Sequence, residues 1–381
     1  MTSFQHFQSP EYFLMKQVFR SKNMEQYLAH IVEEFIYQTV KKYYDNGQML
    51  EAYRTKYGVK DGLYQQWFSN GQLEVQTTFV DGKIHGEWKE WYRNGQLYIQ
   101  TTYVAGKKHG EFKLWHRNGQ LKIQKTYIHG KEHGEFKEWH DNGLLEIQTT
   151  YVDENRHGEY KVWDNNGQLD IQTTYVYGKR HGEYTCWYSN GHPEGMPLRR
   201  QLHYQTTYVD GKIHGEYNRW YSNRHLFIQT NYVDGKEDGE YKEWYENGQL
   251  HEQTSYVDGK KHGEYKCWYS NGQLHYQTTY VDENRHGEFK QWHENGLLEI
   301  QTTYVDGNIH GEYKSWYDNG QLGTQTTFVN GKKHGEHKEC DSNGILLIET
   351  TYIDGVDINN NDVFSDEEDE YYSYYVSDDD N

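Results

Sequence analysis

Apolar and polar residues alternate along this chain in short runs that recur every 24 residues. One such run, Glu264–Tyr269, places residues of different character on successive positions, which is the side-chain period of a β-strand. The following run, Gln273–Val281, is rich in Thr, Tyr and Val, the residues that strands favour. Asn271 and Gly272 join the two runs, and we expect them to form a two-residue type I′ turn. The pattern therefore predicts one β-hairpin in each unit.

The unit reads H-G-E-Y-K-x-W-Y-x-N-G-Q-L-x-x-Q-T-T-Y-V-D-G-K-x, and about twelve units fill residues 38–355. Both connections within the unit are short, so neighbouring strands must be antiparallel. A single hairpin cannot bury its aromatic residues alone, and stability should come from stacking on its neighbours. We therefore predict an all-β repeat array, an elongated and twisted antiparallel meander of β-hairpins.

The alternation also separates the two faces of the predicted sheet. With a two-residue turn, Tyr265, Leu274 and Tyr280 share one face, which we expect to be the continuous apolar one. The other face holds a tryptophan in every other strand, such as Trp268, with Glu264 on the same strand face. Tryptophans of successive repeats should lie about 9–10 Å apart.

The two ends of the chain differ from the array. Residues 1–37 lack the repeat and show helical spacing of apolar residues, so we expect a small N-terminal helical cap over the first sheet edge. Residues 356–381 form an acidic tail that we expect to be disordered, with ten acidic residues and no basic one from Asp357 onward. Ser365 and Ser377 each precede acidic residues and are candidate phosphorylation sites.

Two departures from the repeat concern its turns. Residues 192–200 are inserted into one hairpin tip, and such a loop is either a tolerated insertion or an interaction element. Its candidate contact residues are His192, Pro193, Pro197, Arg199 and Arg200. Asn223-Arg224 replaces Asn-Gly in the next unit, and we expect a different turn geometry there.

Composition narrows the class of protein. The chain carries 39 Lys and Arg against 58 Asp and Glu, a net charge of −19, and aromatic residues reach 17%. This balance disfavours nucleic-acid binding and, less strongly, contact with anionic membranes. The sequence has no run of 18 apolar residues, no secretory signal, and too few cysteines for a disulfide framework. We therefore expect an intracellular, cytoplasmic protein.

Candidate chemistry is sparse. A histidine precedes the repeat glycine in ten units, as at His262 and His334, but equivalent residues about 9–10 Å apart cannot share one metal ion. We interpret this ladder as structural and expect thermal stability to fall between pH 7 and 5.5. Cys186 and Cys267 occupy a variable strand position and are interpreted as filler. We predict no catalytic residue, no cofactor and no metal.

The G-E-Y-K-x-W-Y-x-N-G-Q-L core resembles the MORN-repeat variant, a family that occurs in bacterial antitoxin-like proteins and in proteins of large DNA viruses. The resemblance covers residues 38–355. It implies an elongated β-hairpin sheet that acts as an attachment or scaffolding module, with no catalytic residues in the repeat. Our interpretation is a non-enzymatic scaffold that mediates protein–protein interaction with an unknown partner. The alternatives are a membrane-surface module that contacts phosphoinositides and an antitoxin-like neutraliser of a partner protein.

Overall fold

The computed structural model describes residue 31 and residues 35–188 and 201–359. The elements that have bounds within these ranges are all β-strands. Successive long strands pair antiparallel, whereas each two-residue strand pairs only with the strand before it, so the predicted all-β meander of hairpins is confirmed. The expected helical cap, the insertion 192–200 with its five candidate residues, Ser365, Ser377 and most of the acidic tail lie outside the described residues. Those predictions stay untested.

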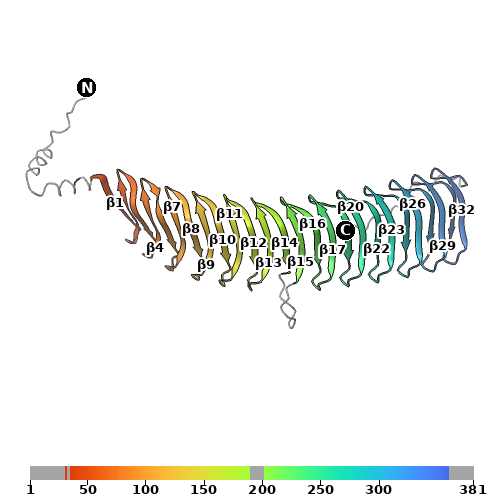
Figure 1. Cartoon of the computed structure of the whole chain (residues 1–381), viewed down its shortest axis with the longest axis horizontal. Coiled ribbons are helices and arrows are strands. Elements are labelled where there is room, and N and C mark those ends of the chain that lie inside the picture. The colour runs from red at the N-terminus through yellow and green to blue at the C-terminus, as the bar shows by residue number, and fades with distance from the viewer. Residues whose placement is uncertain (1–30, 32–34, 189–200, 360–381) are drawn as a thin grey trace, which may run out of the picture. The chain divides into compact units, whose positions relative to one another are not determined.

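The described residues divide into two compact units, and the division in the chain falls after Arg180, near the start of β14 (Lys179–Trp187). In the first unit the strands follow one another in chain order (Figure 1). They are β1 (Tyr37–Tyr43), β2 (Met49–Lys56), β3 (Val59–Trp67), β4 (Leu73–Val80), β5 (Lys83–Ile84), β6 (Gly86–Trp91), β7 (Leu97–Val104), β8 (Lys107–Trp115), β9 (Leu121–Ile128), β10 (Lys131–Trp139), β11 (Leu145–Val152), β12 (Asn155–Trp163) and β13 (Leu169–Val176).

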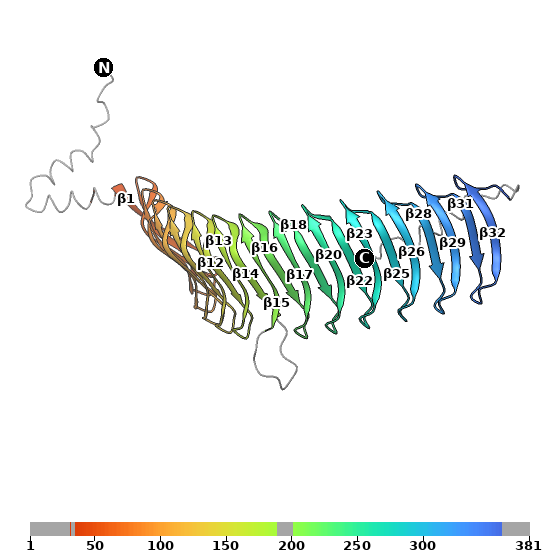
Figure 2. The same cartoon turned by 45° about the vertical axis from the view of Figure 1, so that its right-hand side comes forward.

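The strands of the second unit form the same succession of hairpins, and Figure 2 shows them side by side in chain order. They are β14 (Lys179–Trp187), β15 (Leu202–Val209), β16 (Lys212–Trp220), β17 (Leu226–Val233), β18 (Lys236–Glu237), β19 (Gly239–Trp244), β20 (Leu250–Val257), β21 (Lys260–Lys261), β22 (Gly263–Trp268), β23 (Leu274–Val281), β24 (Asn284–Arg285), β25 (Gly287–Trp292), β26 (Leu298–Val305), β27 (Asn308–Ile309), β28 (Gly311–Trp316), β29 (Leu322–Val329), β30 (Lys332–Lys333), β31 (Gly335–Cys340), β32 (Leu346–Ile353) and β33 (Val356–Asp357).

The Asn-Gly turn does not have the type I′ geometry that we predicted. At the Asn-Gly turn the Gly272 N–H donates to the Tyr269 carbonyl at 2.8 Å, and only Gly272 has a positive φ, of 87°. This is a three-residue loop that ends in a left-handed glycine, and it shifts the strand register between Cys267 and Trp268. The type I′ turn occurs instead at Asp258-Gly259, where φ is 53° and 83°.

The register shift changes which side chains share a face. Tyr265 and Tyr280 do lie together, with ring centroids 5.5 Å apart, as predicted. Leu274, however, is paired with Trp268, so our assignment of Leu274 to the tyrosine face was wrong. The extra residue in the strand after the turn moves Leu274 to the partner of the tryptophan.

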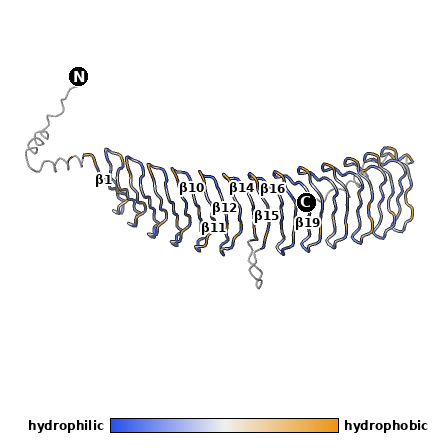
Figure 3. Tube along the Cα trace, viewed as in Figure 1, coloured by the Kyte–Doolittle hydropathy of each residue, from blue (hydrophilic) through white to orange (hydrophobic). Residues whose placement is uncertain are grey.

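The core lies on the tyrosine face, and threonine is its most buried component. Tyr265 is 3% exposed, and Thr278, directly opposite it in register, is also 3% exposed. The equivalent Thr77, Thr254 and Thr326 are each 1% exposed. Hydrophobic and hydrophilic positions are interspersed in every hairpin (Figure 3). Stability therefore comes from thin layers of aromatic rings and threonines stacked between repeats.

The turn with arginine in place of glycine keeps the common geometry, so our expectation of a different geometry was wrong. The Arg224 N–H donates to the Tyr221 carbonyl at 3.1 Å, and Arg224 has a φ of 76°. The Asn223 side chain holds this loop by accepting the His225 N–H at 2.9 Å and donating to the Glu246 carbonyl at 2.6 Å. These bonds keep arginine in a left-handed conformation that L-residues disfavour.

Candidate interaction surface

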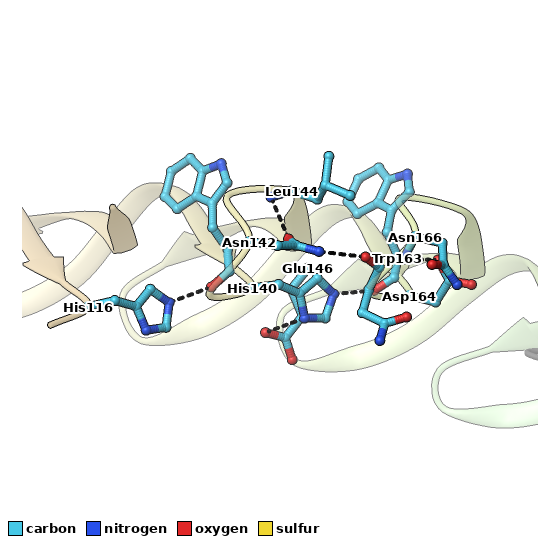
Figure 4. A network of polar contacts seen from close by, with 10 residues as sticks. His116, His140, Asn142, Leu144, Glu146, Trp163, Asp164 and Asn166 are labelled. Carbon is cyan, nitrogen blue, oxygen red and sulfur yellow. Dashed lines mark hydrogen bonds and ion pairs between the residues drawn. The ribbon is translucent and has the colours of Figure 1, made fainter. Parts of the chain in front are cut away.

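Successive repeats are joined at their Asn-Gly turns by a ladder of side-chain to backbone hydrogen bonds. The residue after most repeat tryptophans is a tyrosine or histidine, and it donates to the carbonyl at the tryptophan position of the next repeat; Phe68 and Asp164 are the exceptions in the described residues. His140 Nε2 reaches the Trp163 carbonyl at 3.1 Å, and Tyr245 Oη reaches the Trp268 carbonyl at 2.8 Å. Figure 4 shows this ladder at His116 and His140.

The turn asparagines form a second ladder beside the first. Asn142 accepts the Leu144 N–H at 3.0 Å and donates to the Asn165 carbonyl of the next repeat at 2.7 Å. The same bonds recur at Asn118, Asn247 and Asn295. We call the edge that these turns build in each unit the Asn-Gly rim. Its backbone is fixed by two hydrogen bonds per repeat, so its side chains project from a rigid frame.

The histidine ladder lies at the opposite turns. His334 Nδ1 accepts the Asp354 N–H at 3.4 Å and lies 3.4 Å from the Asp354 carboxylate. The same pair recurs at His214 and Asp234. Each histidine thus contacts the type I′ turn of the following repeat, in agreement with a structural role. The fall in thermal stability that we expect between pH 7 and 5.5 stays a prediction.

The tryptophan face presents the same charged triplet in eight repeats, whereas the repeats that contain Gln65, Thr185, Asn218 and Glu349 depart from it. Lys290 Nζ lies 2.8 Å from Glu288, which also accepts a hydrogen bond from Gln301 at 3.0 Å. The Lys290 ammonium holds the pKa of Glu288 below its ordinary value, although partial burial opposes this. Equivalent triplets occur around Glu240 and Glu312. Where the triplet occurs its charges are paired, so that part of the face offers little to discriminate one partner from another.

Residue type varies from repeat to repeat in one row near the Asn-Gly rim. The row consists of the residue before each tryptophan and the second residue of the following long strand. Its members include an acidic pair, an apolar and basic pair, and a cysteine and histidine pair. These pairs are Glu138 with Glu146, Leu114 with Lys122, and Cys267 with His275. We call these positions the variable row.

Within the variable row, His251 is the histidine with the largest electrostatic perturbation. Hydrogen bonds with Cys267 and Glu243 raise the pKa of His251 to about 10, against the opposing effect of burial. The His251 Nδ1 atom lies 3.1 Å from Glu243 Oε1. Cys267 is 7% exposed, and a thiol so enclosed is poorly placed to attack a substrate. We interpret this cluster as a charged contact between strands.

In the described ranges, no group of three or more His, Cys, Asp and Glu side chains could hold a metal ion. No helix among the same residues is long and apolar enough to cross a membrane. Our sequence reasoning missed the variable row, although aligning the repeats against one another would have revealed it. It also missed the concentration of positive charge in residues 83–131, which contain ten Lys and Arg but three Glu and no Asp.

Comparison with protein families identifies the repeat. The MORN repeat variant model matches nine segments of 22 residues, just over half of the chain. The chain belongs to the MORN repeat variant family. The matched residues are 60–81, 84–105, 108–129, 132–153, 156–177, 237–258, 261–282, 285–306 and 309–330. The family is a repeat scaffold family and not a known enzyme family. The resemblance that we stated from the sequence is confirmed.

Comparison with curated proteins gives no match. Among solved structures, the crystal structure of TcdB2-TccC3-Cdc42 is 10% identical over 82% of this chain and 23% of its own, with a TM-score of 0.13. The structure of TcdB2-TccC3 without its hypervariable C-terminal region is 13% identical over 84% and 18%, with a TM-score of 0.16. The MORN chain spans about a fifth of the solved chains that it matches, and TM-scores this low support no structural argument.

Proposed function

We propose that this chain is a non-enzymatic repeat scaffold that binds a protein partner through the variable row along its Asn-Gly rim. The observation that supports this is the contrast between a repeated frame and a row whose chemistry changes with every repeat. The frame residues satisfy one another, as in the Glu288, Lys290 and Gln301 triplet. Specific recognition needs chemical variety on a rigid support, and the rim combines the two.

The proposal includes an intracellular, cytoplasmic setting. Cys186, Cys267 and Cys340 are all free thiols. Free thiols are usual in reducing compartments, whereas a secreted protein of this kind would tend to pair them.

The test is a tagged pull-down with mass spectrometry from the native cell type, with full-length proteins throughout. One rim variant combines Arg117→Gln with Lys122→Gln in the first unit. A second combines Arg219→Gln with His275→Gln in the second unit. The control, Lys266→Gln with Lys290→Gln on the tryptophan face, removes two positive charges away from the rim. We expect a specific partner that is retained by the control and reduced at least fivefold by one rim variant.

The alternative functions give different results in the same design. A partner lost only from the tryptophan-face control would contradict binding through the rim. Flotation with phosphoinositide vesicles, in the absence of any protein partner, would favour the membrane-surface module. A captured enzyme whose activity falls on binding would favour the antitoxin-like neutraliser.

A further inference from the structure

The last long strand of the second unit is β32, which Figure 2 shows at the end of the sheet. On one side β32 pairs with β31 along residues 346–352. On its other side, within the part of the chain that the structure describes, only Tyr352 and Ile353 pair, with the two-residue strand β33. The backbone of residues 346–350 therefore lies beside no described strand on that side. An open edge of this kind is a template onto which a further strand can add.

Apolar side chains are exposed along this edge. Ile348 is 45% exposed, whereas Ile300, at the equivalent position two repeats earlier, is 4% exposed. Beside Ile300 lies β28 of the next repeat, with Ser315 directly opposite. Leu346 and Leu347 of β32 are exposed as well. The end of the array thus lacks the cover that the following repeat supplies in the interior of the unit.

The start of a further strand is already in place beside β32. In the preceding repeat, the two-residue strand β30 is followed by His334 and then by the six-residue strand β31. The strand β33 corresponds to β30, and the Ile358 N–H donates to the Thr351 carbonyl at 2.9 Å, as the His334 N–H does to the Thr327 carbonyl at 2.7 Å. The described backbone therefore follows the repeat as far as Ile358, and the repeat puts the next strand at residues 359–364.

The residues that come next in the chain match the exposed edge. Two 24-residue repeats after Ser315 and Trp316 stand Val363 and Phe364. In the register of the interior repeats, Val363 lies opposite Ile348, just as Ser315 lies opposite Ile300. Phe364 takes the tryptophan position. The apolar residues of this segment therefore fall at the end of the edge where β32 is apolar and exposed.

One charge in this register opposes the added strand. Asp362 follows Lys338 by one repeat, and it therefore falls opposite Glu349, as Lys338 lies opposite Gln325. Like charges directly opposite each other destabilise a pair of strands. Lys338 Nζ lies 3.1 Å from Glu349 on the other side of β32 and offsets this repulsion. The segment should therefore be held less firmly than an interior strand.

We propose that residues 359–364 add to the open edge of β32 as the last strand of the array, with Val363 opposite Ile348 and Phe364 at the tryptophan position. The end of the array is thus a strand-addition site that the chain itself occupies. A strand from a second copy or from another protein must displace this segment before it can pair with β32. The tail that we expected to be disordered then begins at Ser365.

The first test determines the register by disulfide formation in the full-length chain. Ile348→Cys with Val363→Cys brings two thiols directly opposite each other, and mild oxidation should join them within one chain. The control is Glu349→Cys with Val363→Cys, because adjacent residues of a strand point to opposite faces. Peptide mapping by mass spectrometry should show at least tenfold more of the intramolecular disulfide in the first variant. Equal yields in the two variants, or a disulfide between two copies, would overturn the proposal.

The second test measures amide hydrogen exchange in peptides from β32 of the full-length chain. Val363→Asp with Phe364→Asp should speed this exchange at least threefold. Tyr371→Asp with Tyr372→Asp adds the same charge to the same tail and should leave it unchanged. Asp362→Lys restores the residue type of the repeat and should slow the exchange severalfold. Exchange in β32 that is equal in the native chain and the first variant would contradict an added strand.

Sedimentation velocity separates the proposal from occupation of the edge by a second copy. Ile348→Asp puts a charge on the open edge and should leave the sedimentation coefficient of the full-length chain unchanged. A native dimer that dissociates on Ile348→Asp would mean that β32 pairs with another copy, and the chain's own segment would then not be the occupant.

Discussion

The tyrosine ladder of the Asn-Gly rim makes a quantitative prediction about stability. Tyr221, Tyr245 and Tyr269 donate to the carbonyls of the tryptophans in the following repeats at 2.9, 2.8 and 3.0 Å. Burial raises the pKa of all three tyrosines, and that of Tyr269 to about 12, so each hydroxyl is a proton donor at neutral pH. Replacement by phenylalanine keeps the ring and its stacking but removes the donor.

The magnitude follows from the cost of a lost hydrogen bond between part-buried groups. Each Tyr→Phe change should lower the free energy of unfolding by about 1 kcal/mol. Equivalent residues in adjacent repeats lie about 9–10 Å apart, a separation at which effects are usually additive. The triple variant should therefore lose about 3 kcal/mol, which is large for a protein stabilised by thin layers between repeats.

The assay is urea unfolding of the full-length protein, followed by circular dichroism and by tryptophan fluorescence. The single variants give the free energy of unfolding that each hydrogen bond contributes, and the triple variant tests whether these contributions add. Tyr57→Phe is the control, because that side chain is 69% exposed and should cost less than 0.5 kcal/mol. A triple variant within 0.5 kcal/mol of the parent, or a control as costly as the single variants, would refute the argument that the ladder joins the repeats.

Three further predictions address the turn, the core and the buried charge. Arg224→Gly relieves a residue held at a φ of 76° and should raise the free energy of unfolding by about 1 kcal/mol in urea titrations. Phe289→Ala, at a ring that is 2% exposed, should cost about 3–5 kcal/mol, whereas Val305→Ala, at a residue 39% exposed, should cost under 1 kcal/mol. Because the folded pKa of His251 is raised above the unfolded value, its stabilisation is complete below about pH 6.5 and disappears as the pH rises toward 10. His251→Gln should therefore cost more at pH 6.5 than at pH 10 in the same assay, and equal costs would contradict the assigned role of Cys267 and Glu243.

The repeat period was sufficient to predict the hairpin array, because a strict 24-residue spacing of turn residues and aromatics leaves few other folds. It was not sufficient for the details of the turns. Asn-Gly is the usual signal of a type I′ turn, but here Gly272 alone takes the left-handed conformation. The asparagine is used instead for a side-chain bond to the next repeat, as at Asn271 and the Glu294 carbonyl. That contact lies between units and is invisible in the pattern of a single unit.

The same limit explains why the buried threonines and the variable row were not predicted. Thr278 has a polar side chain, yet it lies opposite Tyr265 in the sheet and is buried. Our prediction of a different geometry at the Asn223-Arg224 turn was wrong for a related reason. Its geometry is set by the Glu246 carbonyl of the following repeat rather than by the preference of arginine.

These contacts between repeats also indicate which surface residues can change to suit a binding partner. A change in the tyrosine, threonine or turn asparagine of any unit disturbs the neighbouring unit as well, because each of them bonds or packs across the boundary. The variable row accepts different residue types at one position, since Glu138 and Glu146 stand where the preceding repeat has Leu114 and Lys122, although His251 also bonds to Cys267 of the next repeat. The row at the Asn-Gly rim is therefore a place where residue chemistry changes from one repeat to the next while the hydrogen-bonded frame beside it recurs.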